Sequence, residues 1–381
     1  MPSGFSRVLA LPVLLAALLA VLLAAIAARS ASAADPAKTL HIAFPGAETS
    51  FDPAFASDAA SDSIIENVFD TMLDYDYLAR PVMLVTRALE AMPTVEDGGR
   101  TYVCRVRKGI YFTPDPAFKG RRRELTAADF AYGIERILDP AVKSPWLWLF
   151  EGKIVGGDEA RARALKTGHF DYDAPIAGLE VVDRYTLRIR LTSPDLRFAY
   201  ALAVPNVAAQ AREVVEAYGN DIGAHPVGTG PYILGAYQRS TKIELVANPG
   251  FRETYYTPAG PIPQASQPVA AALKGKRLPL AGRIEISIIE EGQGRWLAFL
   301  KGEVDTLDSI PVDFVDQALD NGKLKPALAA RGIVHDILIR PNTYWTYFNM
   351  KDPVVGGYTP AKIALRRAIA MGYDVGSLIR V

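Results

Sequence analysis

The chain has 381 residues, and its 42 lysine and arginine residues balance its 42 aspartate and glutamate residues, so the formal net charge is zero. This balance gives no basic surface of the kind that binds nucleic acid, so we expect no nucleic-acid partner. The length allows about two domains with sizeable cores. The single cysteine, Cys104, cannot form a disulfide within the chain, and we expect it to be a buried structural thiol.

Residues 1–34 have the features of a secretory signal peptide. Arg7 precedes an apolar run at Val8–Ala28, and Ala31-Ser32-Ala33 supplies a small-residue cleavage site. An apolar run of about 20 residues could also span a bilayer as an uncleaved anchor, so this alternative stays open. No cysteine stands at the cleavage point, which argues against a lipid anchor. We therefore expect an exported periplasmic protein that is not a lipoprotein.

The first predicted elements after the leader are a strand, a loop and a helix. Thr39–Phe44 is a short apolar strand, and the loop Ala47–Pro53 follows it. A helix is predicted over Asp62–Leu73, where apolar residues recur at helical spacing and are expected to be core. These residues are Ile64, Ile65, Val68, Phe69 and Met72.

The stretch from Asp97 to Pro140 carries the clearest pattern. Asp97-Gly98-Gly99 is a tight-turn signal, and the strand Thr101–Arg107 alternates between apolar and charged residues. A second short strand is predicted at Ile110–Phe112. The basic run Arg121-Arg122-Arg123 is expected in a solvated loop. A helix with a capping-box-like start at Thr126 follows and ends before Pro140.

The middle of the chain predicts further strands and a boundary. Leu179–Leu191 is typical of a hairpin, a helix is predicted from Ser193, and Lys242–Asn248 is typical of a strand. The segment His225–Tyr232 is rich in glycine. Tyr255–Leu280 is rich in proline, alanine and glycine without a clear period, so we place the domain boundary there.

The last part of the chain predicts a second αβ region. A strand at Arg283–Ile289 precedes a helix at Gly294–Lys301 with Gly302 as its C-cap, and a strand at Val304–Leu307 follows. Another strand is predicted at Tyr344–Met350. A helix then begins with Thr359 as N-cap and Pro360 at its first position, and it ends at Gly372.

Five of these segments resemble the extracytoplasmic solute-binding proteins of family 5. They are the loop Ala47–Pro53, the turn, strands and helix of residues 97–140, the glycine-rich segment His225–Tyr232, the sequence RWLAFLKGEVDTL at 295–307, and the strand Tyr344–Met350. The resemblance implies an α/β, two-lobed periplasmic-binding-protein fold of class II, the large peptide-binding type. It implies a first lobe at 35–282, with an inserted subdomain at about 69–200, and the start of a second lobe at 283–381. Because family members continue beyond this point, we expect a C-terminally truncated second lobe.

The family's members capture peptides, nickel or haem for ABC importers. The resemblance therefore implies a monomer that binds a peptide or peptide-like solute in an interlobe cleft and delivers it to permease and ATPase subunits. It implies no enzyme and no cofactor, and the four histidines show no metal-binding spacing. A truncated remnant that no longer transports, or a sensory or interaction protein of the same fold, stays open as the alternative.

The candidate ligand-binding residues come from both lobes. The loop after the first strand offers carboxylate and hydroxyl groups that either face the cleft or cap the next helix. In the strand Tyr344–Met350, one face offers two aromatic rings and an amide, and the glycine-rich segment offers two lesser candidates. The full set is Glu48, Thr49, Ser50, Trp345, Tyr347, Asn349, Thr229 and Tyr232.

Overall fold

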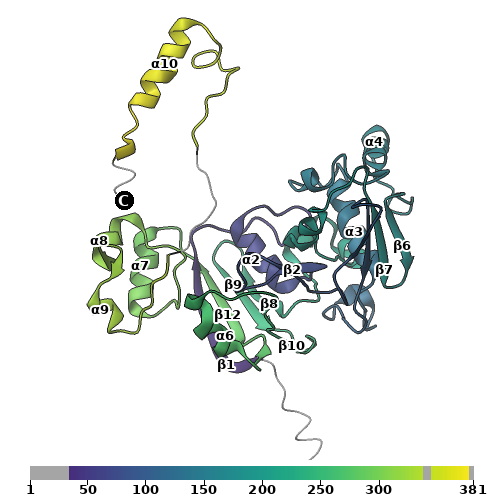
Figure 1. The fold of residues 1–381 in the computed structure, drawn as a ribbon, viewed down its shortest axis with the longest axis horizontal. Coiled ribbons are helices and arrows are strands. Elements are labelled where there is room, and N and C mark those ends of the chain that lie inside the picture. Colours follow the sequence, from purple (N-terminus) through teal and green to yellow (C-terminus); the bar gives the residue numbers. More distant parts are fainter. Residues whose placement is uncertain (1–33, 338–344, 377–381) are drawn as a thin grey trace, which may run out of the picture. The chain divides into compact units, whose positions relative to one another are not determined.

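The computed structural model describes residues 34–337 and 345–376 (Figure 1). These residues form two compact units, each described here by itself. The first unit runs to Glu291 and includes Glu303–Thr306, and the second contains Gly292–Gly302 and the chain from Leu307 onward. The predicted signal peptide lies outside the described residues, apart from Ala34. No helix among the described residues is long and apolar enough to cross a membrane.

The first unit is built on a four-stranded sheet whose strands come from both ends of the unit. The order is β1 (Asp35–Phe44), β12 (Ala281–Ile288), β9 (Lys242–Ala247) and β8 (Tyr232–Gln238). Strands β1 and β12 are parallel, with Ile42 opposite Ile286, and the other pairs are antiparallel. A parallel bridge joins Ile42 to Thr306 on the other side of β1.

Helix α2 (Ala59–Val68) packs its apolar side chains against this sheet. Ile64, Ile65 and Val68 are fully buried in one cluster with Ile243 and Leu245 of β9. Burial of each of these side chains stabilises the folded state by roughly 1.5–3 kcal/mol. The predicted apolar stripe is therefore core, but the helix is shorter than expected, because the chain leaves helical geometry at Phe69.

A second sheet and a second apolar core lie in the same unit. The sheet order is β4 (Thr94–Glu96), β5 (Thr101–Arg105), β7 (Thr186–Arg190) and β6 (Leu179–Asp183), all antiparallel. The helix α3 (Ala127–Leu138) packs against it, and Figure 1 shows α3, β6 and β7 together in this region. The core draws on residues from Ala54 to Val214, a wider span than the predicted subdomain of about 69–200.

The strongest sequence patterns of this sheet are confirmed. Tyr102 and Cys104 of β5 are buried, as the alternation predicts, and the turn residue Asp97 has a φ of 51°. Helix α3 begins with the predicted box: the Asp129 carboxylate accepts from the Thr126 backbone N–H at 2.7 Å and from its hydroxyl at 2.8 Å. These bonds satisfy donors that a helix start otherwise leaves free.

Several predicted elements of the first unit differ in the structure. Residues 110–112 make only one bridge, between Tyr111 and Glu124, instead of a strand. The helix predicted from Ser193 is replaced by a 3₁₀ turn at Phe198–Ala203. The segment predicted as a linker holds helix α6 (Gln267–Leu273) and the strand pair β10 (Thr254–Tyr255) and β11 (Arg277–Leu278).

The predicted lobe boundary also differs. The strand predicted to open the second lobe is β12, and it lies inside the first sheet, between β1 and β9. The division of the chain falls after Glu291 instead. Local composition detects the loop-rich insertion before β12, but it carries no signal for pairing with a strand about 240 residues earlier (286 − 42 = 244).

The remaining elements of the first unit are short. The helices are α4 (Gly157–Thr167) and α5 (Arg212–Tyr218), and a strand pair is formed by β2 (Leu73–Tyr75) and β3 (Leu84–Thr86). The 3₁₀ turns besides Phe198–Ala203 are Pro116–Phe118, Leu147–Leu149, Pro205–Val207, Gly219–Ala224 and Gln264–Ser266.

The second unit has short helices around a small aromatic cluster. Trp296 of α7 (Gly292–Lys301) is buried and stacks on Phe314, with ring centroids 5.8 Å apart. The other elements of this region are the 3₁₀ turn Val312–Phe314, α8 (Val315–Ala318), β13 (Leu319–Asp320), β14 (Lys323–Leu324) and α9 (Pro326–Ala329). Gly302 ends α7 with a φ of 77°, as the sequence predicts.

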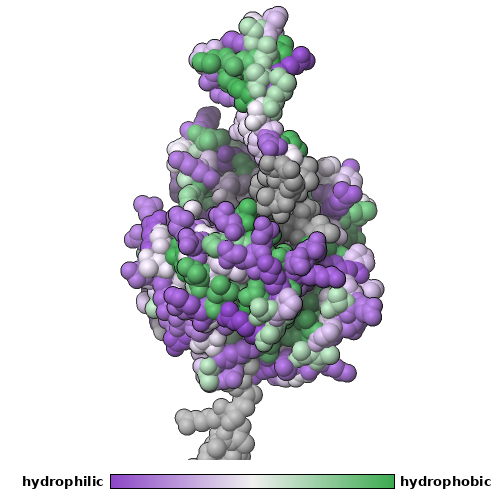
Figure 2. Space-filling view, turned by 90° about the vertical axis from the view of Figure 1, so that its left-hand side faces the viewer, coloured by the Kyte–Doolittle hydropathy of each residue, from purple (hydrophilic) through white to green (hydrophobic). Residues whose placement is uncertain are grey.

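The final helix, α10 (Pro360–Met371), is confirmed with Thr359 as its N-cap. Its apolar face is open to solvent: Leu365 is 39% and Ile369 48% exposed. Figure 2 shows green, apolar side chains on the surface of this uppermost segment. The strand predicted at 344–350 is not formed by its described residues, Trp345–Met350, and Tyr344 lies outside the description.

Replacing Gly228 with alanine is expected to destabilise the first unit. The added Cβ would lie 2.0 Å from the carbonyl oxygen of Val68, and a backbone atom cannot move aside as a flexible side chain would. We expect a loss of at least about 2 kcal/mol in the free energy of unfolding, measured by urea denaturation. The matched control is Gly46→Ala, whose Cβ meets nothing within 4 Å. Equal stability of the two variants would contradict the predicted clash.

Candidate functional site

The carboxyl ends of the parallel strands mark one edge of the first sheet. The loop at 45–58 follows β1, and the chain passes to the second unit after Glu291, beyond β12, and again after Thr306. In α/β sheets, ligands bind outside the carboxyl ends of parallel strands. This edge is therefore the candidate ligand-facing surface of the first unit.

A buried ion pair holds the loop at this edge. Arg136 of α3 donates from Nη1 to Asp52 Oδ1 at 2.6 Å and from Nη2 to Asp52 Oδ2 at 2.8 Å. Both side chains are only 6% exposed, and Arg136 also donates to the Gln210 side chain. Removing one partner of such a pair lowers the free energy of unfolding by about 3–5 kcal/mol, because the other charge stays buried without a partner.

Two further side chains fix the end of the loop. Trp146 Nε1 donates to the Ala56 carbonyl at 2.6 Å, and Asn206 Nδ2 donates to the same oxygen at 3.1 Å. Phe55 is 48% exposed beside this anchor, and Trp148 is 61% exposed. The sequence analysis missed these aromatic residues, because Trp146 and Ala56 lie 90 positions apart and only the fold brings them together.

One oxygen of the Glu48 carboxylate is hydrogen-bonded inside the first unit, while the other, Oε2, is buried without a hydrogen-bond partner among the described residues. Glu48 is 4% exposed, and its Oε1 accepts from the Tyr237 hydroxyl at 2.8 Å and the Ser240 backbone N–H at 2.9 Å. Burial and the hydrogen bond to Glu48 raise the pKa of Tyr237. Glu48 therefore ties the loop after β1 to the turn between β8 and β9, and the structure does not present it as a partner for a ligand ammonium.

Thr49 and Ser50 support the start of α2, which is the second of the two roles expected for this loop. The Asp58 carboxylate caps α2 by accepting from the Ser61 backbone N–H at 2.8 Å, and it also accepts from the Thr49 hydroxyl at 2.5 Å. The Ser61 hydroxyl accepts from the backbone N–H groups of Thr49 and Ser50. Of this pair, Thr49 remains exposed, while Ser50 is buried.

Thr229 and Tyr232 are also committed to internal contacts. Thr229 is 2% exposed and donates to Asp70 Oδ2 at 2.8 Å. Tyr232 is 6% exposed and donates to the Ala281 carbonyl at 3.0 Å. The glycine-rich segment is thus held inside the first unit by these hydrogen bonds. This is a structural role, which the sequence leaves open beside ligand binding.

Asp70 is the centre of a buried charge cluster. Its carboxylate is fully buried and accepts from Arg87 Nε at 2.8 Å and from Arg252 Nη1 at 2.6 Å. Burial alone would raise the pKa of the Asp70 carboxyl, but the Arg252 and Arg87 guanidiniums outweigh it and lower the pKa to about 2. The sequence analysis missed this cluster, whose members are up to 182 positions apart.

The second-unit candidates are exposed. Trp345 is 73% and Tyr347 79% exposed, and Asn349 Oδ1 accepts from the Lys351 backbone N–H at 3.0 Å. The described residues Trp345–Met350 form no strand, so they do not provide the expected strand face. Both aromatic rings are exposed on the second unit.

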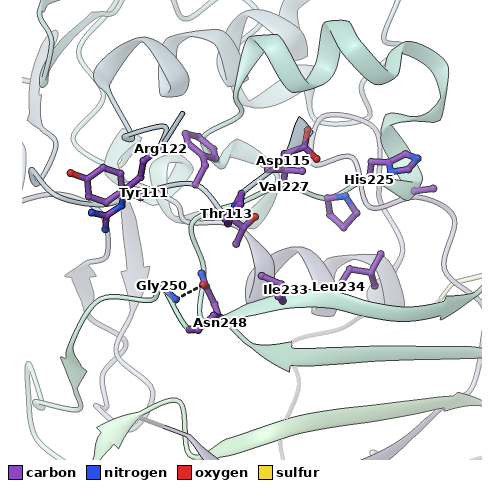
Figure 3. A pocket seen from close by; sticks show the side chains of 15 residues that line it. Tyr111, Thr113, Asp115, Arg122, His225, Val227, Ile233, Leu234, Asn248 and Gly250 are labelled. Carbon is purple, nitrogen blue, oxygen red and sulfur yellow. Dashed lines mark hydrogen bonds between the residues drawn. The ribbon is translucent and has the colours of Figure 1, made fainter. Parts of the chain in front are cut away.

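Two cavities of ligand size lie in the first unit. One, of about 750 Å³, lies between the loop Tyr111–Asp115 and strand β8 (Figure 3). The other, of about 900 Å³, lies beside the Asp70 cluster and includes Tyr232 in its wall. None of the other predicted site residues lines either cavity.

Two further observations concern metal ligands and the single thiol. Among residues 34–337 and 345–376, no group of three or more metal-ligating side chains could hold a metal ion. Cys104 is fully buried, and burial raises the pKa of its thiol to about 12, which is the expected inert structural state.

Asp70 is expected to contribute stability that depends on pH. A folded pKa of about 2, below the unfolded value of about 3.9, stabilises the first unit by roughly 2–3 kcal/mol above pH 4, and this is lost as the pH falls towards 2. Asp70→Asn should lower the free energy of unfolding at pH 7. The difference in the free energy of unfolding between the variant and the parent protein should decrease as the pH falls from about 4 to 2. Asp221→Asn, at an exposed position, is the control. A gap that stays constant with pH would contradict this assignment.

Comparison with known proteins agrees with this architecture. The chain is 28% identical to di/tripeptide-binding protein 1 of Pseudomonas aeruginosa over 224 residues, 56% of this chain and 38% of the relative. It is 28% identical to the glutathione-binding protein GsiB of Escherichia coli O157:H7 over 221 residues, 58% of this chain and 36% of the relative. The chain thus spans well under half the length of these relatives.

A solved structure shows the same fold. The periplasmic binding protein DppA from Helicobacter pylori, in complex with the peptide STSA, matches with a TM-score of 0.55 and 20% identity, over 74% of this chain and 48% of DppA. The two-lobed α/β fold expected from the sequence is therefore confirmed. The model of the bacterial extracellular solute-binding proteins, family 5 Middle, matches residues 84–381. The protein belongs to the family 5 bacterial extracellular solute-binding proteins.

Proposed function

We propose that this protein is a binding component of an ABC importer that captures peptides or peptide-like solutes outside the cytoplasm. The family match over residues 84–381 carries the proposal. It is supported by relatives whose names state that they bind di- and tripeptides or glutathione, and by the peptide complex of DppA. Delivery to permease and ATPase subunits, action as a monomer and a periplasmic location after signal-peptide cleavage are parts of the same proposal.

The geometry supports a ligand surface on each unit. On the first unit, the loop at the carboxyl edge is fixed by the Asp52–Arg136 pair and presents Thr49 and Phe55 to solvent. On the second, Trp345 and Tyr347 are exposed. Rigid aromatic rings supply contact area at low entropic cost, and a fixed loop loses little freedom on binding. Of the residues predicted from sequence, we retain Thr49, Trp345, Tyr347 and Asn349 as proposed ligand contacts.

Short peptides are expected to stabilise the protein against heat. A ligand that binds only the folded state stabilises it by RT ln(1 + c/Kd), where c is the free ligand concentration, so the melting temperature rises with ligand concentration. The measurement is a thermal-shift series with di-, tri- and tetrapeptides and glutathione, followed by calorimetric titration of the best ligand. Tyr347→Ala should weaken binding by about tenfold or more, because truncating a central aromatic contact costs over 1 kcal/mol. Tyr358→Ala is the matched control, since Tyr358 is equally exposed at 79%.

Two outcomes would overturn the proposal. One is the absence of any peptide-dependent shift from a protein whose native fold is verified by circular dichroism. The other is stabilisation by a non-peptide solute alone. Equal weakening by the Tyr347 and Tyr358 variants would remove Tyr347 from the proposed contacts while leaving peptide capture in place.

A further inference from the structure

The cleft in Figure 3 lies where the two cores of the first unit meet. Phe112, which lines it, belongs to the core of the second sheet, whereas Leu234 packs on the core of the first. The Thr113 backbone N–H donates to the Gly228 carbonyl at 2.9 Å and joins the loop to the glycine-rich segment. Pockets of this size between packed bodies are typical of small-ligand sites.

One side of the cleft is the open edge of a sheet. Strand β8 is the last strand in the order β1-β12-β9-β8, so in the described part of the chain it pairs on one side only, with β9. Its residues Ile233 and Leu234 line the cleft, and Figure 3 shows both beside the edge strand. An edge strand offers a row of backbone donors and acceptors to an added extended peptide.

The two ends of the cleft differ in charge. At one end the Arg122 guanidinium lies over the Tyr111 ring, 3.5 Å from its centroid. At the other, Figure 3 shows Asp115 and His225. Asp115 accepts from the Tyr218 hydroxyl at 2.9 Å and from the Ala117 backbone N–H at 2.8 Å, and its oxygens have further lone pairs to accept an ammonium.

The middle of the cleft is apolar. Pro114, Pro226 and Val227 line it together with Ile233 and Leu234 of β8, so a bound side chain would leave water for an apolar surface. A cation at one end, a carboxylate at the other and a backbone edge between them match a zwitterionic chain of a few residues. A single apolar metabolite would leave both charged ends and the strand edge unused.

We propose that this cleft is a second peptide site, contained within the first unit, in which a short zwitterionic peptide adds as a strand to the edge of β8. Its carboxylate lies at Arg122 and its ammonium at Asp115, and its central side chain occupies the apolar middle. None of the proposed capture residues, Thr49, Phe55, Trp345, Tyr347 and Asn349, lines the cleft, so the site is separate from the capture surface proposed above.

The test follows the backbone amides of β8 by hydrogen exchange in the intact protein. The probe is the tripeptide Ala-Leu-Ala with free termini, compared with its N-acetylated, C-amidated form and a form with a methylated central amide. We expect the free peptide to slow exchange of amides within 233–235; the Ala236 N–H already donates to Glu244 Oε2 at 3.1 Å. Blocking the termini or methylating the amide should weaken this effect at least tenfold.

Matched variants separate this site from the capture surface. Arg122→Glu should abolish the protection of β8, while Arg121→Glu, one position earlier and outside the cleft wall, should retain it. Tyr347→Ala should leave it unchanged, because Tyr347 belongs to the second unit. Protection lost equally in both arginine variants, or kept with the blocked peptide, would overturn the second site. Loss of the Tyr347-dependent part of peptide binding, with β8 protection intact, would count against the capture surface only.

Discussion

The ion pair between Asp52 and Arg136 is the interaction on which the first unit depends most. Asp52 follows Phe51, which belongs to the core of the first sheet, and Arg136 lies on α3, whose neighbours fill the core of the second. A bidentate pair fixes both distance and direction, which a hydrophobic contact would not. The loop after β1 is therefore positioned by charge geometry, and Trp146 and Asn206 complete its attachment.

Asp70 holds the glycine-rich segment in place, as the Asp52–Arg136 pair holds the loop after β1. A fully buried carboxylate is tolerable only because two guanidiniums and the Thr229 hydroxyl surround it. Gly228 and Gly230 bring this segment against the backbone of α2, where a side chain would clash. The sequence motif that resembles the family is thus explained by close packing and charge burial rather than by contact with a ligand.

Sequence reasoning was reliable for local patterns and weak for contacts between distant segments. The capping box at Thr126, the hairpin at 179–191 and the N-cap at Thr359 depend on neighbours within a few residues, and all are confirmed. The sequence predicts the strand β12 but not its place in the sheet between β1 and β9, because its partner β1 is far away in the chain. For the same reason Glu48 looked available to a ligand, although its carboxylate is buried and Tyr237 and Ser240 donate to one of its oxygens.

The placement of β12 has a consequence for how the protein is made. The parallel partner of the first strand begins at residue 281, so β1 waits for most of the unit to be synthesised before its sheet can close. Closing so long a loop costs conformational entropy before the β1–β12 contacts can compensate for it, and this slows folding. The first sheet, with Ile284 and Ile286 in its core, is therefore expected to be among the last parts of this unit to form.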